Sequence, residues 1–282
     1  MPSCRPRRAW LHRRGLRAAA PVLVAGALLA ASCGGTTRVA VPSGPPPKLG
    51  PVVFRGSFAP TGTSRLVTNE YATWNPHAPS AVHAADWIVT SGSLFSRNGD
   101  GWSGVPDGTS PGPQSSPTNG SAVFRMTTRA DDFDDAAVLM RFRNHGLTST
   151  SRTPKQPWDG VHVFLRYSSA AELYYASLNR RDGTVAIKKK VHGGAHEVDG
   201  GTYTTLATGH WKVPYGQWQD AEAVVRTVGH DVAISVYVDG HLVVAAVDHG
   251  QGGRAPLTKP GRVGIRADNC NFDVSTFEVA RV

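Results

Sequence analysis

Hydrophobic and polar residues alternate along much of the chain, as they do in β-strands with one buried face. The clearest example is the stretch WDGVHVFLRY, residues 158–167. If it forms an extended strand, its apolar and aromatic side comprises Val161, Val163, Leu165 and Tyr167. The opposite side comprises His162, Phe164 and Arg166. The first set can fill a protein core. The second set then points away from that core, toward solvent, a ligand or another part of the chain.

Downstream of residue 52 there is no helical periodicity, and short β-branched and aromatic runs alternate with turn residues instead. Asp182-Gly183 and Asp239-Gly240 are strong hairpin signals, because type I′ turns need a positive φ at both central positions. Many short strands without helices predict an all-β sandwich of two sheets. We expect strands at residues 122–127, 137–143, 161–167, 173–179, 185–191, 221–228, 232–238, 242–247, 263–267 and 272–279.

The order of several segments resembles one known superfamily. The segments are DWIVTSGSLF, HVFLRY, LYYASLNRRDGTVAIKKKV, ISVYVDGHLVVAAVD and GRVGIRADNCNFDVSTFEV. Together they are similar to the concanavalin A-like lectin/glucanase superfamily, in its laminin-G-like branch, over residues 52–282. The resemblance implies a jelly roll with one concave sheet, on which lectins, binding modules and glycan-cleaving enzymes hold their ligands. Fold alone does not assign the chemistry.

The N-terminus has the plan of a bacterial export signal. Six arginines and no acidic residues fall in residues 1–32, and residues 18–31 form an apolar run that is shorter than the ~20 residues a membrane span needs. The run ends in LAASC, which resembles a lipobox and implies cleavage before Cys33 and lipidation of that cysteine. Ordinary secretion is the alternative. We therefore expect a signal peptide over 1–32, a flexible Pro/Gly-rich tether over 33–50, a jelly-roll domain over 51–282, and a location on the extracellular face of the membrane.

The high pI of about 9.8 is mostly a property of the leader. Without the leader's six arginines, 24 basic residues stand against 21 acidic ones. Such a small excess is poor evidence for nucleic-acid binding. We expect no nucleic-acid partner and a monomeric protein.

Alternation places a mixed set of side chains on the outer face of three sequential strands. We expect the shared face to carry His162, Phe164, Arg166, Tyr175, Asn179, Lys188 and Lys190, with Arg143 added from the strand at 137–143. Sugar rings stack on aromatic side chains, and Arg and Lys attract uronates or sulfates. A solvated outer face, or a second core beneath a covering loop, would have the same composition. Lys189 interrupts the alternation of its strand.

Catalytic and metal signals are weak. The E-x-D-x-x-E motif of the superfamily's retaining glucanases is absent, and the run at residues 131–135 has the composition of a solvated turn. Asp159 and Glu172 flank the expected groove, and His162, Tyr175 and Arg166 have the chemistry of a polysaccharide lyase. The catalytic residues stay unknown at this point. The resemblance implies a structural calcium ion at Asp273, for which the alternative is a strand-edge aspartate bonded to backbone amides.

Cysteine and histidine usage excludes other classes of site. If Cys33 is lipidated, Cys270 has no disulfide partner, and it has the character of a buried small residue. His192 and His196 lie in a Gly-containing stretch rather than on a helix, which favours a loop over a zinc site. The sequence therefore predicts a surface-tethered lipoprotein that holds a polysaccharide or other glycan on its concave sheet. A glycan-cleaving enzyme and a protein-interaction module are the alternatives.

Overall fold

The computed structural model describes residues 39–62, 64–109, 118, 120, 122–194, 198–212 and 214–282. These residues belong to one compact unit, Val39–Val282. The predicted signal peptide and the predicted lipidation site, Cys33, lie outside the described residues.

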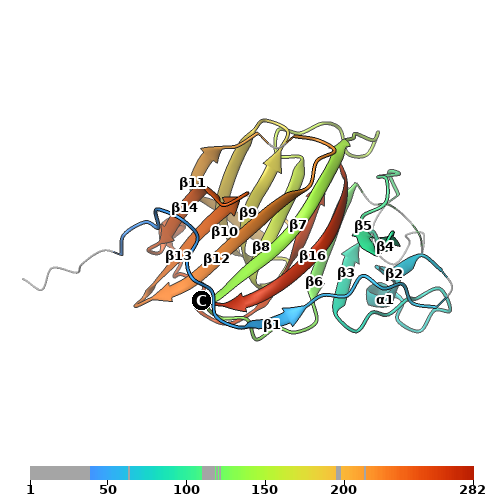
Figure 1. Ribbon diagram of the computed structural model, residues 1–282, viewed down its shortest axis with the longest axis horizontal. Helices are drawn as coiled ribbons and strands as arrows, with labels where there is room; N and C mark the ends of the chain where they lie inside the picture. Colours follow the sequence, from blue (N-terminus) through green and yellow to red (C-terminus); the bar gives the residue numbers. More distant parts are fainter. Residues whose placement is uncertain are drawn as a thin grey trace, which may run out of the picture. The chain divides into compact units, whose positions relative to one another are not determined.

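The first sheet, here sheet A, has nine strands that pair antiparallel. Its order is β14-β13-β12-β7-β16-β5-β4-β2, and β1 pairs with β16 (Figure 1). The strands are β1 (Val52–Arg55), β2 (Leu66–Asn69), β4 (Ser93–Arg97), β5 (Asp100–Trp102), β7 (Ala136–Leu147), β12 (Gln219–Val228), β13 (Asp231–Val238), β14 (His241–Asp248) and β16 (Cys270–Arg281).

The second sheet, here sheet B, has seven antiparallel strands in the order β11-β10-β9-β8-β15-β6-β3. The strands are β3 (Trp87–Ser91), β6 (Val123–Thr128), β8 (Gly160–Ser169), β9 (Glu172–Arg180), β10 (Thr184–His192), β11 (Gly201–His210) and β15 (Arg262–Asp268). Two short helices complete the described part, α1 (Tyr71–Trp74) and the 3₁₀ helix η1 (Gln251–Gly253). Within this part, neither helix has the length and apolarity to cross a bilayer.

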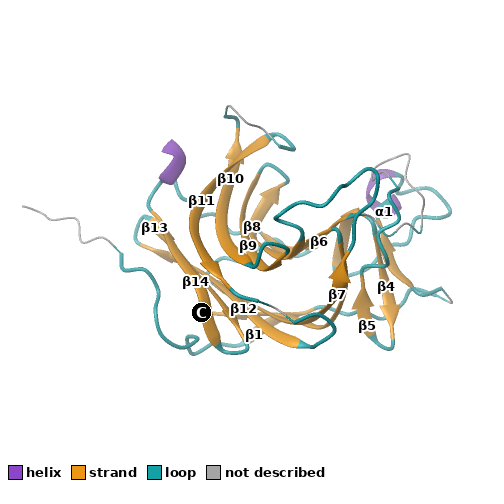
Figure 2. Cartoon of the chain, turned by 90° about the horizontal axis from the view of Figure 1, so that it is seen from above, coloured by secondary structure: helices purple, strands orange, loops and turns teal. Residues whose placement is uncertain are grey.

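The two sheets lie face to face, as Figure 2 shows in a view from above. One large apolar core fills the space between them. The core follows the alternation in the sequence as far as Leu165, because Val161, Val163 and Leu165 of β8 are buried in it. Tyr167, expected on the same side, packs against Phe164 on the opposite side instead. Trp87 of β3 packs edge-on against Phe54 of β1 and Phe277 of β16. The predicted all-β, two-sheet jelly-roll sandwich is confirmed.

All ten predicted strands are present, each within a few residues of its expected bounds. The Asp239-Gly240 turn has a φ of 50° and 77° at its two residues, as a type I′ hairpin requires. At the other predicted turn only Gly183 has a positive φ, of 72°, so that turn is of another type. The Thr-rich strand β11 was not predicted, because it lacks a run of apolar residues.

Contacts to the sandwich reach into the segment that composition predicts as a tether. The amide of Gly50 donates to the carbonyl of Arg281 at 2.8 Å. Leu49 packs with Val282 against a small apolar cluster that includes Tyr237 on the outer face of sheet A. The packed part of the chain therefore begins before residue 51.

Candidate functional site

Sheet B is strongly curved, with its hollow side turned away from sheet A (Figure 2). We call this side the concave face. Strand register aligns Lys188 of β10 with Tyr175 of β9, and Tyr175 with Phe164 of β8. The next rows add Lys190 with Tyr203, and His162 with Arg266. The concave face is defined by His162, Phe164, Tyr175, Lys188, Lys190, Tyr203, Arg266, Asp268 and Arg125.

Aromatic rings form a connected layer on this face. The rings of Phe164 and Tyr175 are 6.4 Å apart, and those of Tyr175 and Tyr203 are 5.9 Å apart. His162 stacks on Tyr175 with 4.5 Å between centroids. Tyr203 is only partly buried, whereas His162, Phe164 and Tyr175 are buried. Of these four rings, Tyr203 is therefore the one best placed to meet a ligand.

Lysines border these rings. The Nζ atoms of Lys190 and Lys188 lie 5.0 Å and 5.9 Å from the centroid of the Tyr203 ring, within cation–π range. Lys190 also donates to the carbonyl of Ala170 at 2.5 Å. Burial lowers the pKa of Lys188, and burial together with nearby arginines lowers the pKa of Lys190 to about 8. A negatively charged ligand would relieve this crowding of positive charge.

Arg266 and Asp268 form an ion pair on this face. Nε of Arg266 donates to Asp268 Oδ2 at 2.8 Å, and Nη2 donates to Oδ1 at 2.9 Å. Burial acts to raise the pKa of Asp268, but the charge and hydrogen bonds of Arg266 outweigh it and hold that pKa below its usual range. Burial lowers the pKa of His162, so this imidazole is neutral at pH 7. Its Nε2 lies 3.4 Å from Asp268 Oδ2, longer than an ordinary hydrogen bond.

Two cavities open along the concave face, and Arg266 lines both. One, of about 240 Å³, also has Arg152 and Trp158 in its wall, and the Trp158 side chain is 46% exposed. The other, of about 10 Å³, lies between Tyr203, Phe164 and an ion pair of Arg125 with Asp199, whose charged atoms are 2.7 Å apart. The accessible surface thus runs from Trp158 past Arg266 to Tyr203.

The predicted site residues divide into two groups. His162, Phe164, Tyr175, Lys188 and Lys190 share one face, as the alternation predicts. The other three predicted members lie elsewhere, and their predicted placement is wrong.

Asn179 and Arg166 leave the concave face because β8 and β9 do not pair regularly. A register shift after Val161 turns Asn179 toward sheet A, where its Oδ1 accepts from Asn144 at 2.9 Å. Arg166 has a φ of 46° and a second shift follows Leu165. Its guanidinium is buried against Asp135 and the carbonyl of Leu257. Each irregularity leaves a residue unpaired, and this reverses the side of the sheet to which the following side chains point.

Arg143 belongs to the opposite sheet. It lies on the outer face of sheet A, where its Nη2 is 2.7 Å from Asp273 and its guanidinium is 4.5 Å from the ring of Trp218. Arg97 and His145 also contact the buried Asp273 carboxylate. The two guanidinium groups bonded to this carboxylate repel a cation, so the residues present do not fit the calcium ion implied at Asp273. In the described part of the chain, no group of three or more His, Cys, Asp and Glu side chains is arranged to hold a metal.

The two flanking carboxylates are engaged in local structure. Asp159 is buried and accepts from Asn269 and Arg181 at 3.1 and 3.0 Å. Glu172 accepts from Ser168 at 2.7 Å. These contacts make both residues loop-stabilising groups in this structure.

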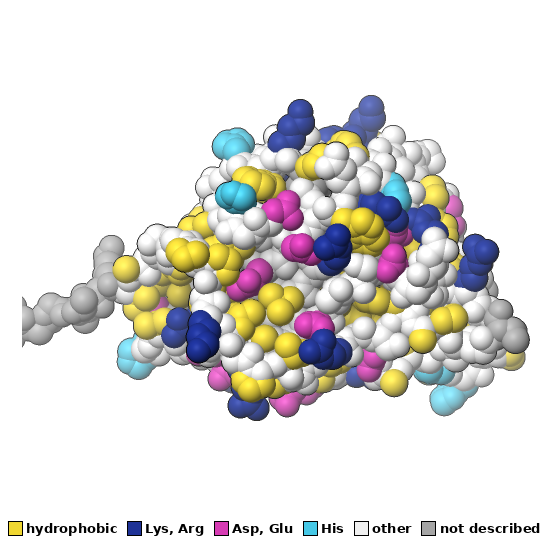
Figure 3. Space-filling view, viewed as in Figure 1, with side chains coloured by type: hydrophobic (Ala, Val, Ile, Leu, Met, Phe, Trp, Pro, Cys, Tyr) yellow, Lys and Arg dark blue, Asp and Glu magenta, His cyan; other side chains and the backbone are white. Residues whose placement is uncertain are grey.

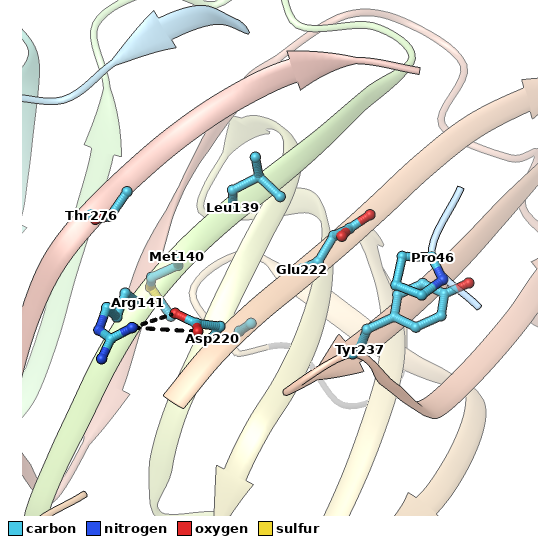
Figure 4. Close-up of a pocket in the computed structure, with 10 residues that line it drawn as sticks. Pro46, Leu139, Met140, Arg141, Asp220, Glu222, Tyr237 and Thr276 are labelled. Atoms are coloured by element: carbon cyan, nitrogen blue, oxygen red, sulfur yellow. Dashed lines mark hydrogen bonds and ion pairs between the residues drawn. The ribbon is translucent and has the colours of Figure 1, made fainter. Parts of the chain in front are cut away.

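A separate cavity of about 380 Å³ lies on the outer face of sheet A (Figure 4). Arg141 and Asp220 contact each other there at 3.4 Å, and Pro46 lies beside Tyr237. Burial raises the pKa of Glu222, which lies between Leu139 and Tyr237 in the strand register. Acidic and basic side chains are interspersed on the face seen in Figure 3. This cavity therefore offers apolar walls and one half-buried carboxyl group, without the ring-and-cation layer of the concave face.

Comparison with known proteins bears on the fold. No family model matches the chain, and no curated protein matches its sequence. A Bacillus subtilis protein of unknown function with a galectin-like fold matches with a TM-score of 0.50 and 12% identity, over 83% of this chain and 97% of that one. A structure from work on endo-acting O-glycanases, which members of the human gut microbiota express to initiate mucin breakdown, matches with a TM-score of 0.50 and 9% identity, over 82% and 100%.

The chain thus shares its jelly-roll sandwich fold with a protein described as galectin-like. A carbohydrate-binding module of the CBM66 type from B. subtilis matches less well, with a TM-score of 0.45 and 11% identity, over 69% of this chain and 94% of that one. At these identities the likeness concerns the fold, and the chemistry has to be argued from the residues of the concave face.

Proposed function

We propose that the protein is a cell-surface lipoprotein that binds an acidic glycan on the concave face of sheet B, without cleaving it. Lipidation at Cys33 would hold it on the extracellular side of the membrane. The observation that carries the binding proposal is the layer of rings and cations around Tyr203, Lys188 and Arg266. The likeness in fold to a structure from work on O-glycanases, at a TM-score of 0.50, supports a glycan as the ligand.

The chemistry of this face suits a sugar carrying carboxylate or sulfate groups. The partly buried Tyr203 offers a ring for the C–H face of a sugar, and Trp158 offers another beside the larger cavity. The two acidic side chains of the site, Asp268 and Asp199, are already paired with arginines. The lysines therefore leave a positive balance that attracts an anionic polymer.

Removing accessible groups of the concave face is expected to weaken glycan retention. Tyr203→Ala and Lys188→Ala should each lower the affinity for a uronate polymer about tenfold, through loss of roughly 1–2 kcal/mol of stacking or charge attraction. Arg226→Ala and Tyr215→Ala are the matched controls, because both side chains are exposed and lie outside this face. A glycan array identifies the ligand, and affinity electrophoresis in uronate polymers measures the change. Equal retention by all four variants would remove the site assignment.

Binding is expected to weaken as the pH rises through about 8. The folded-state pKa of Lys190 is about 8, below the ordinary lysine value of 10.5, so its positive charge is present below that pH and lost above it. The affinity for an acidic polymer should fall about fivefold between pH 7 and pH 9, the effect of roughly 1 kcal/mol. Lys190→Arg, which stays charged, should bind with little change over the same range. A wild-type profile as flat as that of the variant would contradict a role for Lys190.

A further inference from the structure

One lysine of sheet B faces the core instead of the concave face. Lys189 of β10 and Asp248 at the end of β14 are both 0% exposed, and Lys189 Nζ lies 2.9 Å from Asp248 Oδ1. The pair joins sheet B to sheet A across the interior. It is separate from Lys188 and Lys190, which point to the other side of the strand.

The surroundings hold both groups in place. The hydroxyl of Tyr174 donates to Asp248 Oδ2 at 2.7 Å, and the amide of Gly250 donates to Oδ1 at 2.9 Å. Lys189 Nζ also donates to the carbonyl of Arg254 at 2.6 Å. Burial raises the pKa of Tyr174, so its phenol remains a hydrogen-bond donor at any physiological pH.

We propose that Lys189 and Asp248 condense into an amide, an isopeptide bond between the two sheets. One proton passes from Nζ to Oδ1 along the existing hydrogen bond, which gives a neutral amine and a carboxylic acid. The nitrogen lone pair then forms a bond to Cγ, the Cγ–Oδ1 bond breaks, and a second proton of Nζ follows to Oδ1. Water leaves with these two protons, and no other reactant is consumed.

The site favours this reaction for three reasons. Both side chains are 0% exposed, so bulk water that would hydrolyse the new amide is kept away from the pair. The fold holds the amine against the carboxyl group, which replaces a bimolecular encounter. Tyr174 stabilises the negative charge that develops on Oδ2, as an oxyanion-hole donor does.

The product fits the same contacts. Oδ2 becomes the amide oxygen and keeps the hydrogen bond from Tyr174, and the remaining N–H still points to the carbonyl of Arg254. Arg254 and Ala255, whose carbonyls face Lys189 Nζ, line a surface cavity of about 370 Å³, so only these residues separate the pair from the surface there. The bond would close a loop between positions 59 residues apart. The described residues contain one cysteine, Cys270, which is free and buried, so this bond would supply a covalent link that disulfides do not.

Intact-mass spectrometry of the purified protein tests the proposal directly. The measured mass should be lower, by one water molecule, than the mass calculated for the purified chain. That calculation starts from the N-terminal residue determined for the same sample. After proteolysis, one cross-linked species should contain the peptides of Lys189 and Asp248. A wild-type protein that keeps its full mass after prolonged incubation overturns the proposal and leaves the pair as a permanent ion pair.

Variants distinguish this bond from other losses of water. Asp182-Gly183 and Asp239-Gly240 can lose water by forming a succinimide, but a succinimide persists in Lys189→Arg and the isopeptide bond does not. Lys189→Arg should therefore show the full mass. Tyr174→Phe should form the bond about a hundredfold more slowly, the typical effect of losing one such donor. If Lys189→Arg does not fold, the cross-linked peptide of the wild type still decides the question.

Discussion

Replacing Trp87 with Ala is expected to lower the free energy of unfolding by about 3–5 kcal/mol, the usual effect of emptying the space of a large core aromatic side chain. Trp87 is 0% exposed. Its ring stacks on Phe58 at 5.6 Å and meets Phe277 edge-on at 5.2 Å. Its Nε1 donates to the carbonyl of Ser57 at 2.7 Å. The substitution therefore removes packing between the sheets and one buried hydrogen bond.

Urea denaturation followed by circular dichroism measures this loss. Trp74→Ala is the matched control, because Trp74 is 44% exposed on the short helix α1 and should contribute about 1 kcal/mol or less. Similar midpoints for the two variants would show that Trp87 does not join the N-terminal strands to the core.

Period-two alternation was sufficient to predict the ten strands and one face of sheet B. His162 and Phe164 alternate with Val161 and Val163 without interruption, so their opposite orientations follow from strand geometry. The same argument fails for Arg166 and Asn179, because an unpaired residue in one strand reverses the orientation of everything after it. Such irregularities depend on the partner strand, and a single strand's sequence does not record them.

Long-range pairing explains the other differences. Arg143 was grouped with the concave face because its strand is adjacent in sequence to β8, but β7 pairs with β12 and β16 in sheet A. Arg266 follows the alternation of VGIRAD and could have been predicted to lie outside the core. Tyr203 stands in a polar strand, and Trp158 stands in a loop, so neither carries a periodic signal.

Lys189 shows how a departure from pattern can be informative. Alternation places position 189 in the core, where an uncompensated ammonium group would be strongly destabilising. The compensating carboxylate, Asp248, comes from the other sheet and from the end of a different hairpin. The sequence therefore marks the position as unusual, while the reason for it exists only in the folded structure.

Asp248→Ala is expected to lower the free energy of unfolding by about 3–5 kcal/mol or more, because it leaves the buried Lys189 without a counter-charge. Tyr174 loses its acceptor in the same step. The expectation holds for the ion pair, and loss of an isopeptide bond would add to it. Asp231→Ala is the control, because Asp231 pairs with His249 nearby but both side chains are partly exposed, at 22% and 34%.

A surface pair of that kind contributes about 1 kcal/mol or less, so the control should unfold near the wild-type midpoint. Denaturation of both variants at pH 7 gives the comparison. If Asp248→Ala were as stable as Asp231→Ala, the buried carboxylate would not be what holds Lys189 inside the sandwich. Apolar packing alone would then hold sheet A and sheet B together at this point.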